Sequence, residues 1–283
     1  MSERHGVRWI DDVFRVARSA DRAVLIPYVT LGYPTPERSL ALADAAIAGG
    51  ADILELGVPF SDPLADGRVI QGATQGALAQ GTTVRVCLEL AARLRTQRPE
   101  VPFLFMGYLN PILAFGEAAF CQACRGAGVD GLIVPDLPPE EGGAIEELCR
   151  QEGLALVYLL APNTPPERMR LICQRSRGYV YVVSVTGTTG ARDSLPTDLA
   201  DFVSRVRGVT DKPIAVGFGI SKPEQAAAVA QLADGVIVGS AVVRRCESET
   251  GPSDVERFVA DLRAAMARGD SPPTQGPEPG SRV

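Results

Sequence analysis

Eight short apolar runs, each separated from the next by sequence of helical character, constrain the fold of this chain most strongly. The runs are rich in β-branched residues, which is typical of strands buried on both faces of a parallel sheet. They occupy residues 23–30, 53–57, 101–108, 131–135, 154–161, 179–184, 213–217 and 235–239. Eight β–α units in about 250 residues fit a closed (β/α)8 barrel better than an open doubly wound sheet. The sequence therefore predicts an α/β fold, a single TIM barrel.

Three segments extend this pattern beyond a minimal barrel. Residues 9–20 carry apolar side chains at helical spacing ahead of the first strand, which predicts an extra N-terminal helix. Extended loops are predicted after strands two and six, the first leading into helical sequence between about 70 and 94 that Gly81 interrupts. Residues 1–267 are expected to form one barrel domain. Residues 268–283 are rich in Pro and Gly without apolar periodicity, and are expected to be a disordered tail.

The charge balance argues against several classes of partner. The formal net charge is -6, the sequence pI is near 5.0, and the Lys and Arg residues are scattered. A surface for polyanions is therefore not expected, and neither is a nucleic-acid partner. The N-terminal segment lacks the apolar core of a leader peptide, and no later run reaches membrane-spanning length. We expect a cytoplasmic protein with no membrane partner.

Cysteine and histidine offer little chemistry in this sequence. Six cysteines are too sparse for a disulfide framework in a chain of 283 residues. Cys121 and Cys124 form a Cys-x-x-Cys pair, but they lie in a helical pattern with no second pair nearby, so packing on a helix face is favoured over a redox or zinc site. The single histidine, His5, lies in the N-terminal segment. Acid–base chemistry would therefore depend on carboxylates or tyrosine, and no metal is expected.

Two carboxylates stand out around the second strand. Glu55 lies between two leucines, where an unpaired buried carboxylate is costly and either finds a partner or stays protonated. Asp66 follows eleven positions later, after a loop stiffened by Pro59 and Pro63 that is long enough to fold back over the strand end. Two acids in different environments can divide acid and base roles. An ordinary ion pair or a loop cap is the alternative that the spacing leaves open.

Glycine turns after strands seven and eight predict a phosphate site. In a barrel the strand ends converge on the carboxyl-terminal face, and the last two loops commonly bind phosphate through backbone N–H groups. Gly219 follows strand seven, and Gly239 and Ser240 follow strand eight at the start of a short helix. Glycine lets a ligand approach the backbone closely, although glycines that merely make tight turns would give the same pattern.

The loop after strand six is rich in glycine and hydroxyl groups. It begins with Thr186-Gly-Thr-Thr-Gly190 and is long enough to act as a lid over a ligand. Together with the two acids and the glycine turns, it predicts a barrel enzyme that acts on a small phosphorylated metabolite. The residues alone do not identify that metabolite.

Three segments closely resemble the tryptophan synthase α-subunit family. They are the stretch from Leu54 to Gly67, Ser184-Val-Thr-Gly-Thr-Thr-Gly-Ala-Arg, and Gly217-Phe-Gly-Ile-Ser. The resemblance covers about residues 8 to 267. It implies the same barrel fold and a lyase of tryptophan biosynthesis, which cleaves indole-3-glycerol phosphate to indole and glyceraldehyde 3-phosphate without a metal or organic cofactor of its own.

The resemblance also implies residue roles. Glu55 matches the acid–base glutamate that protonates C3 of the indole ring, and Asp66 matches the aspartate that binds the indole N–H. Other positions match the phosphate site and the indole pocket with its lid. They are Gly190, Gly219, Gly239 and Ser240 for phosphate, and Tyr28, Tyr108, Tyr181, Thr189 and Phe218 for the indole pocket. Each aromatic residue on a strand is also consistent with simple core packing.

A partner chain follows from the same resemblance. In this family the α-subunit assembles with a β-subunit as an α2β2 heterotetramer, and that β-subunit carries pyridoxal phosphate. Asp62 and Pro63 match positions that face the partner. Two alternatives stay open: a stand-alone lyase that releases free indole, and a non-catalytic activator of a β-subunit. The second would tolerate loss of Glu55 or Asp66, yet both are present.

Overall fold

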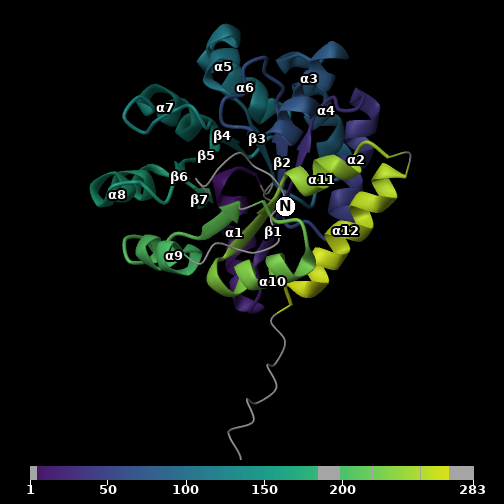
Figure 1. Ribbon diagram of the computed structural model, residues 1–283. Coiled ribbons are helices and arrows are strands. Elements are labelled where there is room, and N and C mark those ends of the chain that lie inside the picture. The colour runs from purple at the N-terminus through teal and green to yellow at the C-terminus, as the bar shows by residue number, and fades with distance from the viewer. Residues whose placement is uncertain (1–4, 184–197, 218, 249, 268–283) are drawn as a thin grey trace, which may run out of the picture.

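The computed structural model describes residues 5–183, 198–217, 219–248 and 250–267. Within these ranges nine parallel strands lie inside a ring of helices (Figure 1). The strands are β1 Val24–Thr30, β2 Leu54–Gly57, β3 Phe103–Met106, β4 Gly131–Ile133, β5 Ala155–Val157, β6 Leu159–Leu160, β7 Val180–Val183, β8 Ile214–Gly217 and β9 Gly235–Val238. The predicted barrel is confirmed, including all eight strand positions.

The strand order explains why there are nine strands rather than eight. The sheet runs β5-β4-β3-β2-β1-β9-β8-β7-β6, so its two ends are the two halves of the predicted fifth strand. Tyr158 separates these halves, because its N–H donates to the Ser176 hydroxyl at 3.1 Å instead of to a neighbouring strand. Its carbonyl still accepts from the Tyr181 N–H at 3.2 Å. The barrel therefore closes at Tyr158.

The helices connect successive strands around the outside. They are α1 Val7–Ser19, α2 Pro36–Ala48, α3 Arg68–Ala79, α4 Val84–Gln97, α5 Leu109–Phe115, α6 Glu117–Gly126, α7 Gly143–Glu152, α8 Pro166–Arg175, α9 Leu199–Arg207, α10 Pro223–Leu232, α11 Ser240–Arg245 and α12 Gly251–Ala265. The extra N-terminal helix is confirmed as α1, and the extension after the second strand contains both α3 and α4. Helix α5 has no counterpart among the predicted elements. The helix after the fourth strand, α7, begins at Gly143.

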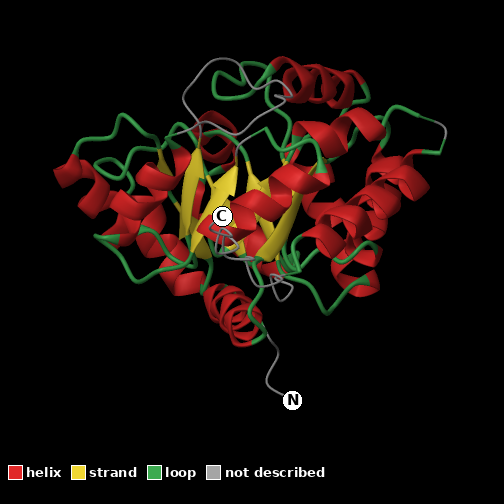
Figure 2. Ribbon diagram, turned by 60° about the horizontal axis from the view of Figure 1, so that its bottom comes forward, coloured by secondary structure: helices red, strands yellow, loops and turns green. Residues whose placement is uncertain are grey.

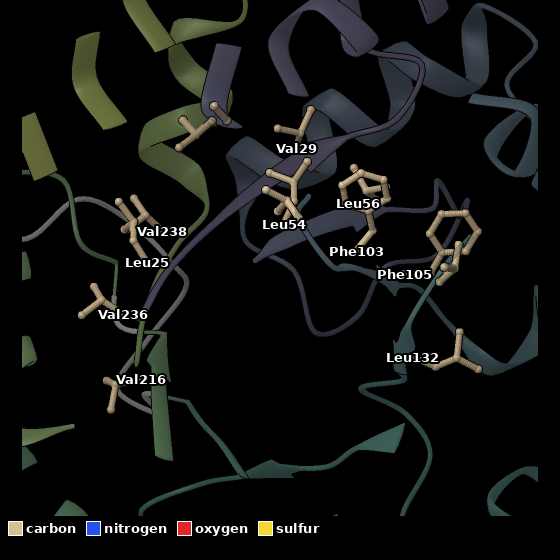
Figure 3. Packing of buried hydrophobic residues seen from close by; sticks show 14 of the residues in the cluster. Leu25, Val29, Leu54, Leu56, Phe103, Phe105, Leu132, Val216, Val236 and Val238 are labelled. Carbon is tan, nitrogen blue, oxygen red and sulfur yellow. The ribbon is translucent and has the colours of Figure 1, made fainter. Parts of the chain in front are cut away.

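Two apolar layers make up the core. Side chains that point outward from the strands pack against the helices, as Figure 3 shows for Leu25, Leu56 and Phe105. The alternate residues fill the barrel interior, where helix α1 adds Ile10 and Phe14 from below. Figure 2 shows the helix next to the N-terminus lying across one end of the barrel. Helix α1 therefore fills this end of the barrel, which we call the floor. A site can open only at the other end.

The floor is fastened by one fully buried carboxylate, Asp130, just before β4. It accepts from the backbone N–H of Gly6 at 2.7 Å and of Phe103 at 2.9 Å. Arg95 of α4 contacts it at 2.6 Å, and Nδ1 of His5 lies 2.7 Å away. The single histidine thus takes part in this network, which joins the start of α1 to two strands and to α4.

Other sequence expectations concern metals, cysteines and the chain end. Cys121 and Cys124 are buried free thiols on α6, as packing on a helix face predicts. Across the described ranges no cluster of His, Cys, Asp or Glu could hold a metal ion. In the same ranges no helix has the length and apolar character needed to cross a membrane. The predicted loop after the sixth strand and the tail at 268–283 lie outside the described residues.

Candidate active site

Glu55 lies inside the barrel, on β2 beside Tyr28 of β1 and Leu104 of β3. The residue is fully buried. Tyr179 donates its hydroxyl proton to Oε1 of Glu55 at 3.1 Å. The second oxygen, Oε2, is buried and has no hydrogen-bond partner within the part of the chain that the structure describes. One oxygen is thus held by the barrel, and the other remains available to a ligand.

This environment sets the ionisation of Glu55. Burial raises the pKa of Glu55 to about 8, although the hydrogen bond from Tyr179 lowers that pKa in part. At neutral pH the carboxyl group is therefore mostly protonated, and it can act as a proton donor. A carboxylic acid kept neutral in this way is unusual for a purely structural residue, because structural carboxylates usually find a cationic partner.

Asp66 lies in the loop between β2 and α3 and is half-buried. Burial raises the pKa of Asp66 to about 6, and a hydrogen bond from the Tyr108 hydroxyl lowers it in part. Asp66 is therefore ionised at neutral pH, while Glu55 is not. The Tyr108 hydroxyl also accepts the N–H of Ala65 at 3.0 Å, which ties this loop to the end of β3.

Glu55 and Asp66 influence the same pair of tyrosines. Burial raises the pKa of Tyr28 and of Tyr181 well above the usual value, and the negative charges of both Glu55 and Asp66 raise these pKa values further. Both acids therefore act on the same two tyrosines. Their surroundings differ, since Glu55 is hydrogen-bonded to Tyr179 and Asp66 to Tyr108, and their joint role at one site stays a prediction.

Two strand-end glycines make room for these tyrosine rings. A Cβ atom at Gly57 would lie 1.9 Å from the Tyr28 hydroxyl oxygen. A Cβ atom at Gly217 would lie 2.8 Å from the Tyr181 hydroxyl oxygen. Each tyrosine ring thus occupies space that a side chain at the neighbouring glycine would fill, so only glycine fits at these two positions. The Tyr28 hydroxyl also accepts from Thr30 at 3.4 Å, so this ring brings a polar group into the site.

The remaining predicted residues are placed only in part. Gly219 has a positive φ of 64°, and Gly239 immediately precedes α11, which begins at Ser240. Thr189, Gly190 and Phe218 lie outside the described residues. Asp62 is exposed and Pro63 is buried, in the loop before α3. Their neighbour Leu64 is 92% exposed.

Sequence reasoning missed Tyr179. It is fully buried and is the one residue in the described ranges whose side chain is hydrogen-bonded to Glu55. The predicted strand at 179–184 contains both Tyr179 and Tyr181, although β7 itself begins at Val180. This spacing of two residues was the available signal, because alternate residues of extended backbone point to the same side. That spacing places both hydroxyls inside the barrel.

The fold and site together define a (β/α)8-barrel enzyme in which one neutral and one ionised carboxyl group share a tyrosine-lined site. The sequence pattern of the family "Tryptophan synthase alpha chain" matches residues 14–268. The chain is 46% identical over 257 residues to the tryptophan synthase alpha chain of Dehalococcoides mccartyi, covering 91% of this chain and 98% of that one. It is 48% identical over 258 residues to that of Chloroflexus aggregans, covering 91% and 97%.

Solved structures agree with the sequence relatives. A Mycobacterium tuberculosis tryptophan synthase structure superimposes with a TM-score of 0.86 at 38% identity, covering 92% of this chain and 98% of the other. An Aquifex aeolicus structure superimposes with a TM-score of 0.85 at 39% identity, covering 92% and 99%. The chain belongs to the tryptophan synthase alpha chain family. It is a lyase of tryptophan biosynthesis that cleaves indole-3-glycerol phosphate to indole and glyceraldehyde 3-phosphate.

Proposed function

We propose that Glu55 is both the acid and the base of this cleavage and that Asp66 binds the indole nitrogen. The observation that carries the proposal is the state of Glu55: it is fully buried, its pKa is raised to about 8, and Oε2 has no partner in the described residues. Asp66 is half-buried and is ionised at neutral pH, which suits a group that must stabilise a cation.

The two states fit a stepwise retro-aldol reaction. Glu55 donates its proton to C3 of the indole ring, and the resulting positive charge at the ring nitrogen is stabilised by the Asp66 carboxylate. The Glu55 carboxylate then accepts the proton of the hydroxyl group on the carbon attached to C3. The bond between that carbon and C3 breaks, its electron pair returns to the ring, and an aldehyde forms. Glu55 ends protonated, ready for another cycle.

The proposed binding site surrounds these two acids. Tyr28, Tyr108 and Tyr181 would contact the indole ring, and the glycines at positions 57 and 217 support this placement because they leave room for two of the rings. Thr189 and Phe218 complete the proposed pocket by resemblance. The phosphate group would lie at Gly190, Gly219, Gly239 and Ser240, where a short helix begins.

We also propose a β-subunit as partner, in an α2β2 assembly, with the pyridoxal phosphate held by that partner and no cofactor in this chain. The exposed Asp62 and Leu64 support an interface at the loop before α3. They line a cavity of about 410 Å³ together with Phe60, Tyr108, Asn110 and Asp136. Tyr108 connects this cavity to Asp66, so a partner seated there would contact the catalytic loop. The biosynthetic role fits a cytoplasmic location.

The experiment is to measure indole release from indole-3-glycerol phosphate by the purified chain, alone and with a tryptophan synthase β-subunit. We expect slow release by the chain alone and a rise of at least about tenfold with the partner, equivalent to about 1.4 kcal/mol in activation free energy. Leu64→Asp should reduce this activation, because it places a charge at an apolar contact, and should leave the basal rate unchanged.

Val16→Asp is the matched control for this experiment, since Val16 is 51% exposed on α1 at the opposite end of the barrel. It should leave both the basal rate and the activation unchanged. Full activity without any β-subunit would instead identify a stand-alone lyase and would overturn the proposed partner.

A further inference from the structure

The floor of the barrel contacts the one side chain that is hydrogen-bonded to Glu55. Phe14 of α1 is buried inside the barrel, and its ring centroid lies 5.5 Å from that of Tyr179 at an interplanar angle of 47°. The ring centroid of Tyr179 lies 6.4 Å from that of Tyr181, and the Tyr179 hydroxyl group donates to Oε1 of Glu55 at 3.1 Å. A continuous line of contacts therefore runs from the N-terminal helix to the glutamate.

Helix α1 is itself held firmly against the strands. The N–H of Gly6 donates to the buried Asp130 at 2.7 Å, and the N–H of Val7 donates to the carbonyl of Gly153 at 3.0 Å. A Cβ atom at Gly235 would lie 3.2 Å from the Phe14 ring, so that ring fits closely against β9. Phe14 therefore has little freedom to move away from Tyr179.

Tyr179 depends on such support for its position. Its hydroxyl group is the one hydrogen-bond donor to Glu55 in the described residues, and a hydrogen bond at 3.1 Å weakens quickly when its geometry is disturbed. Tyr179 is surrounded by apolar groups of the barrel interior. Phe14 and Tyr181 contact the ring of Tyr179 and fix its tilt, but neither forms a hydrogen bond with its hydroxyl group.

We propose that Phe14 is a positioning residue, which holds the Tyr179 ring so that its hydroxyl group stays bonded to Glu55. Helix α1 then has a role in catalysis beyond closing the barrel. This inference rests on the proposed function for its consequence in cleavage, but its structural part concerns Glu55 alone and is tested separately.

The charges near Glu55 allow a clear test. Within the described residues, burial raises the pKa of the hydroxyls of Tyr28, Tyr179 and Tyr181, the charge of Glu55 raises all three further, and the charge of Asp66 also raises that of Tyr28 and Tyr181. On α1, Asp11 interacts instead with Arg177 and Lys212, and Asp12 pairs with Arg15. The ring contact with Tyr179 is therefore the direct route by which a change at Phe14 would affect Glu55.

The experiment is an infrared titration of the Glu55 carboxyl group, with Glu55→Gln used to assign the band. Tyr179→Phe should raise the pKa of Glu55 by about one unit, because it removes a hydrogen bond to the ionised form. Phe14→Leu should raise it by about half a unit by loosening that bond. In the Tyr179→Phe background Phe14→Leu should add no further shift, since the bond is already absent.

Phe120→Leu provides the matched control, since Phe120 of α6 is equally buried and has its own ring partner, Phe115, at 5.9 Å. It should leave the pKa of Glu55 unchanged. If Phe14→Leu folds poorly, Phe14→Met preserves the volume and should give a shift in the same direction. The proposal is overturned if Phe14→Leu behaves like Phe120→Leu, or shifts the pKa equally in both backgrounds.

The cleavage rate separates this inference from the proposed function. Phe14→Leu should reduce kcat by about threefold to tenfold in the Tyr179 background, and much less after Tyr179→Phe. If the pKa of Glu55 shifts in the Phe14 and Tyr179 variants as expected while Glu55→Gln still cleaves the substrate, the positioning role of Phe14 stands, and the proposed catalytic role of Glu55 fails.

Discussion

Replacing Glu55 by glutamine is expected to reduce indole release roughly a thousandfold, the range typical for removing a general acid–base group. Glutamine has nearly the same shape as the neutral carboxyl group and can still accept from Tyr179, so the barrel should keep its structure. It cannot transfer a proton to C3 or accept one from the hydroxyl group. The measurement is kcat for indole release, with and without a β-subunit.

Although Glu55→Gln should lower activity, it should raise the stability of the folded chain at high pH. The pKa of Glu55 is about 8 in the folded chain against an ordinary value of 4.5, so the folded state binds the extra proton between these values. Stability from this group is therefore complete below pH 4.5 and is lost as the pH rises through 8. Glu55→Gln lacks this loss and should be more stable than wild type to urea near pH 9.

Glu147→Gln is a suitable control, because Glu147 lies on the exposed side of α7 and pairs with Arg150. The hydrogen bond from Arg150 lowers the pKa of Glu147 to about 2, so this change should alter neither kcat nor the slope of stability with pH above about pH 5. Substantial indole release by Glu55→Gln would remove Glu55 from the mechanism and would favour the alternative of a non-catalytic activator.

Replacing Asp130 by alanine is expected to give the largest loss of stability, about 3 to 5 kcal/mol, as for breaking a buried ion pair. Burial raises the pKa of Asp130 to about 6 in spite of Arg95, so the carboxylate is ionised at neutral pH. Its removal leaves the N–H groups of Gly6 and Phe103 without their acceptor and Arg95 without its carboxylate. Urea unfolding at pH 7 measures the change in free energy.

Asp12→Ala is the matched control for Asp130. Asp12 also pairs with an arginine, Arg15, but both side chains are more than half exposed, so the loss should be below about 0.5 kcal/mol. If Asp130→Ala lowers the free energy of unfolding as little as the control does, other contacts hold α1 against the barrel.

The fold was largely predictable because its signal is local. A strand buried on both faces needs a continuous apolar run, and a helix needs its own period, so each unit could be recognised without its neighbours. The break at Tyr158 could not be predicted, since it depends on the hydroxyl of Ser176 in another segment. Helix α5 was missed because it spans only seven residues, which is too short to show a helical period.

The site was predictable to the extent that its residues are out of place in their local sequence. Glu55 stands out as an acid among strand apolars, and Asp66 follows a stiff loop of suitable length. Tyr179 has no such signal, because a tyrosine on a strand resembles ordinary core packing and its partner Glu55 is 124 positions away. Phe14 has even less, since its contact with Tyr179 appears only after α1 enters the barrel.

The most direct test of the roles of Glu55 and Asp66 is the dependence of kcat/KM for indole release on pH, in wild type and in Asp66→Asn. We expect a bell-shaped profile of kcat/KM that falls below about pH 6, where Asp66 becomes protonated, and above about pH 8, where Glu55 loses its proton. Asp66→Asn should lower the rate and remove the acidic limb. A wild-type kcat/KM that keeps rising through pH 8 would contradict the proposed role of Glu55, because its reactive form would then be the carboxylate rather than the acid.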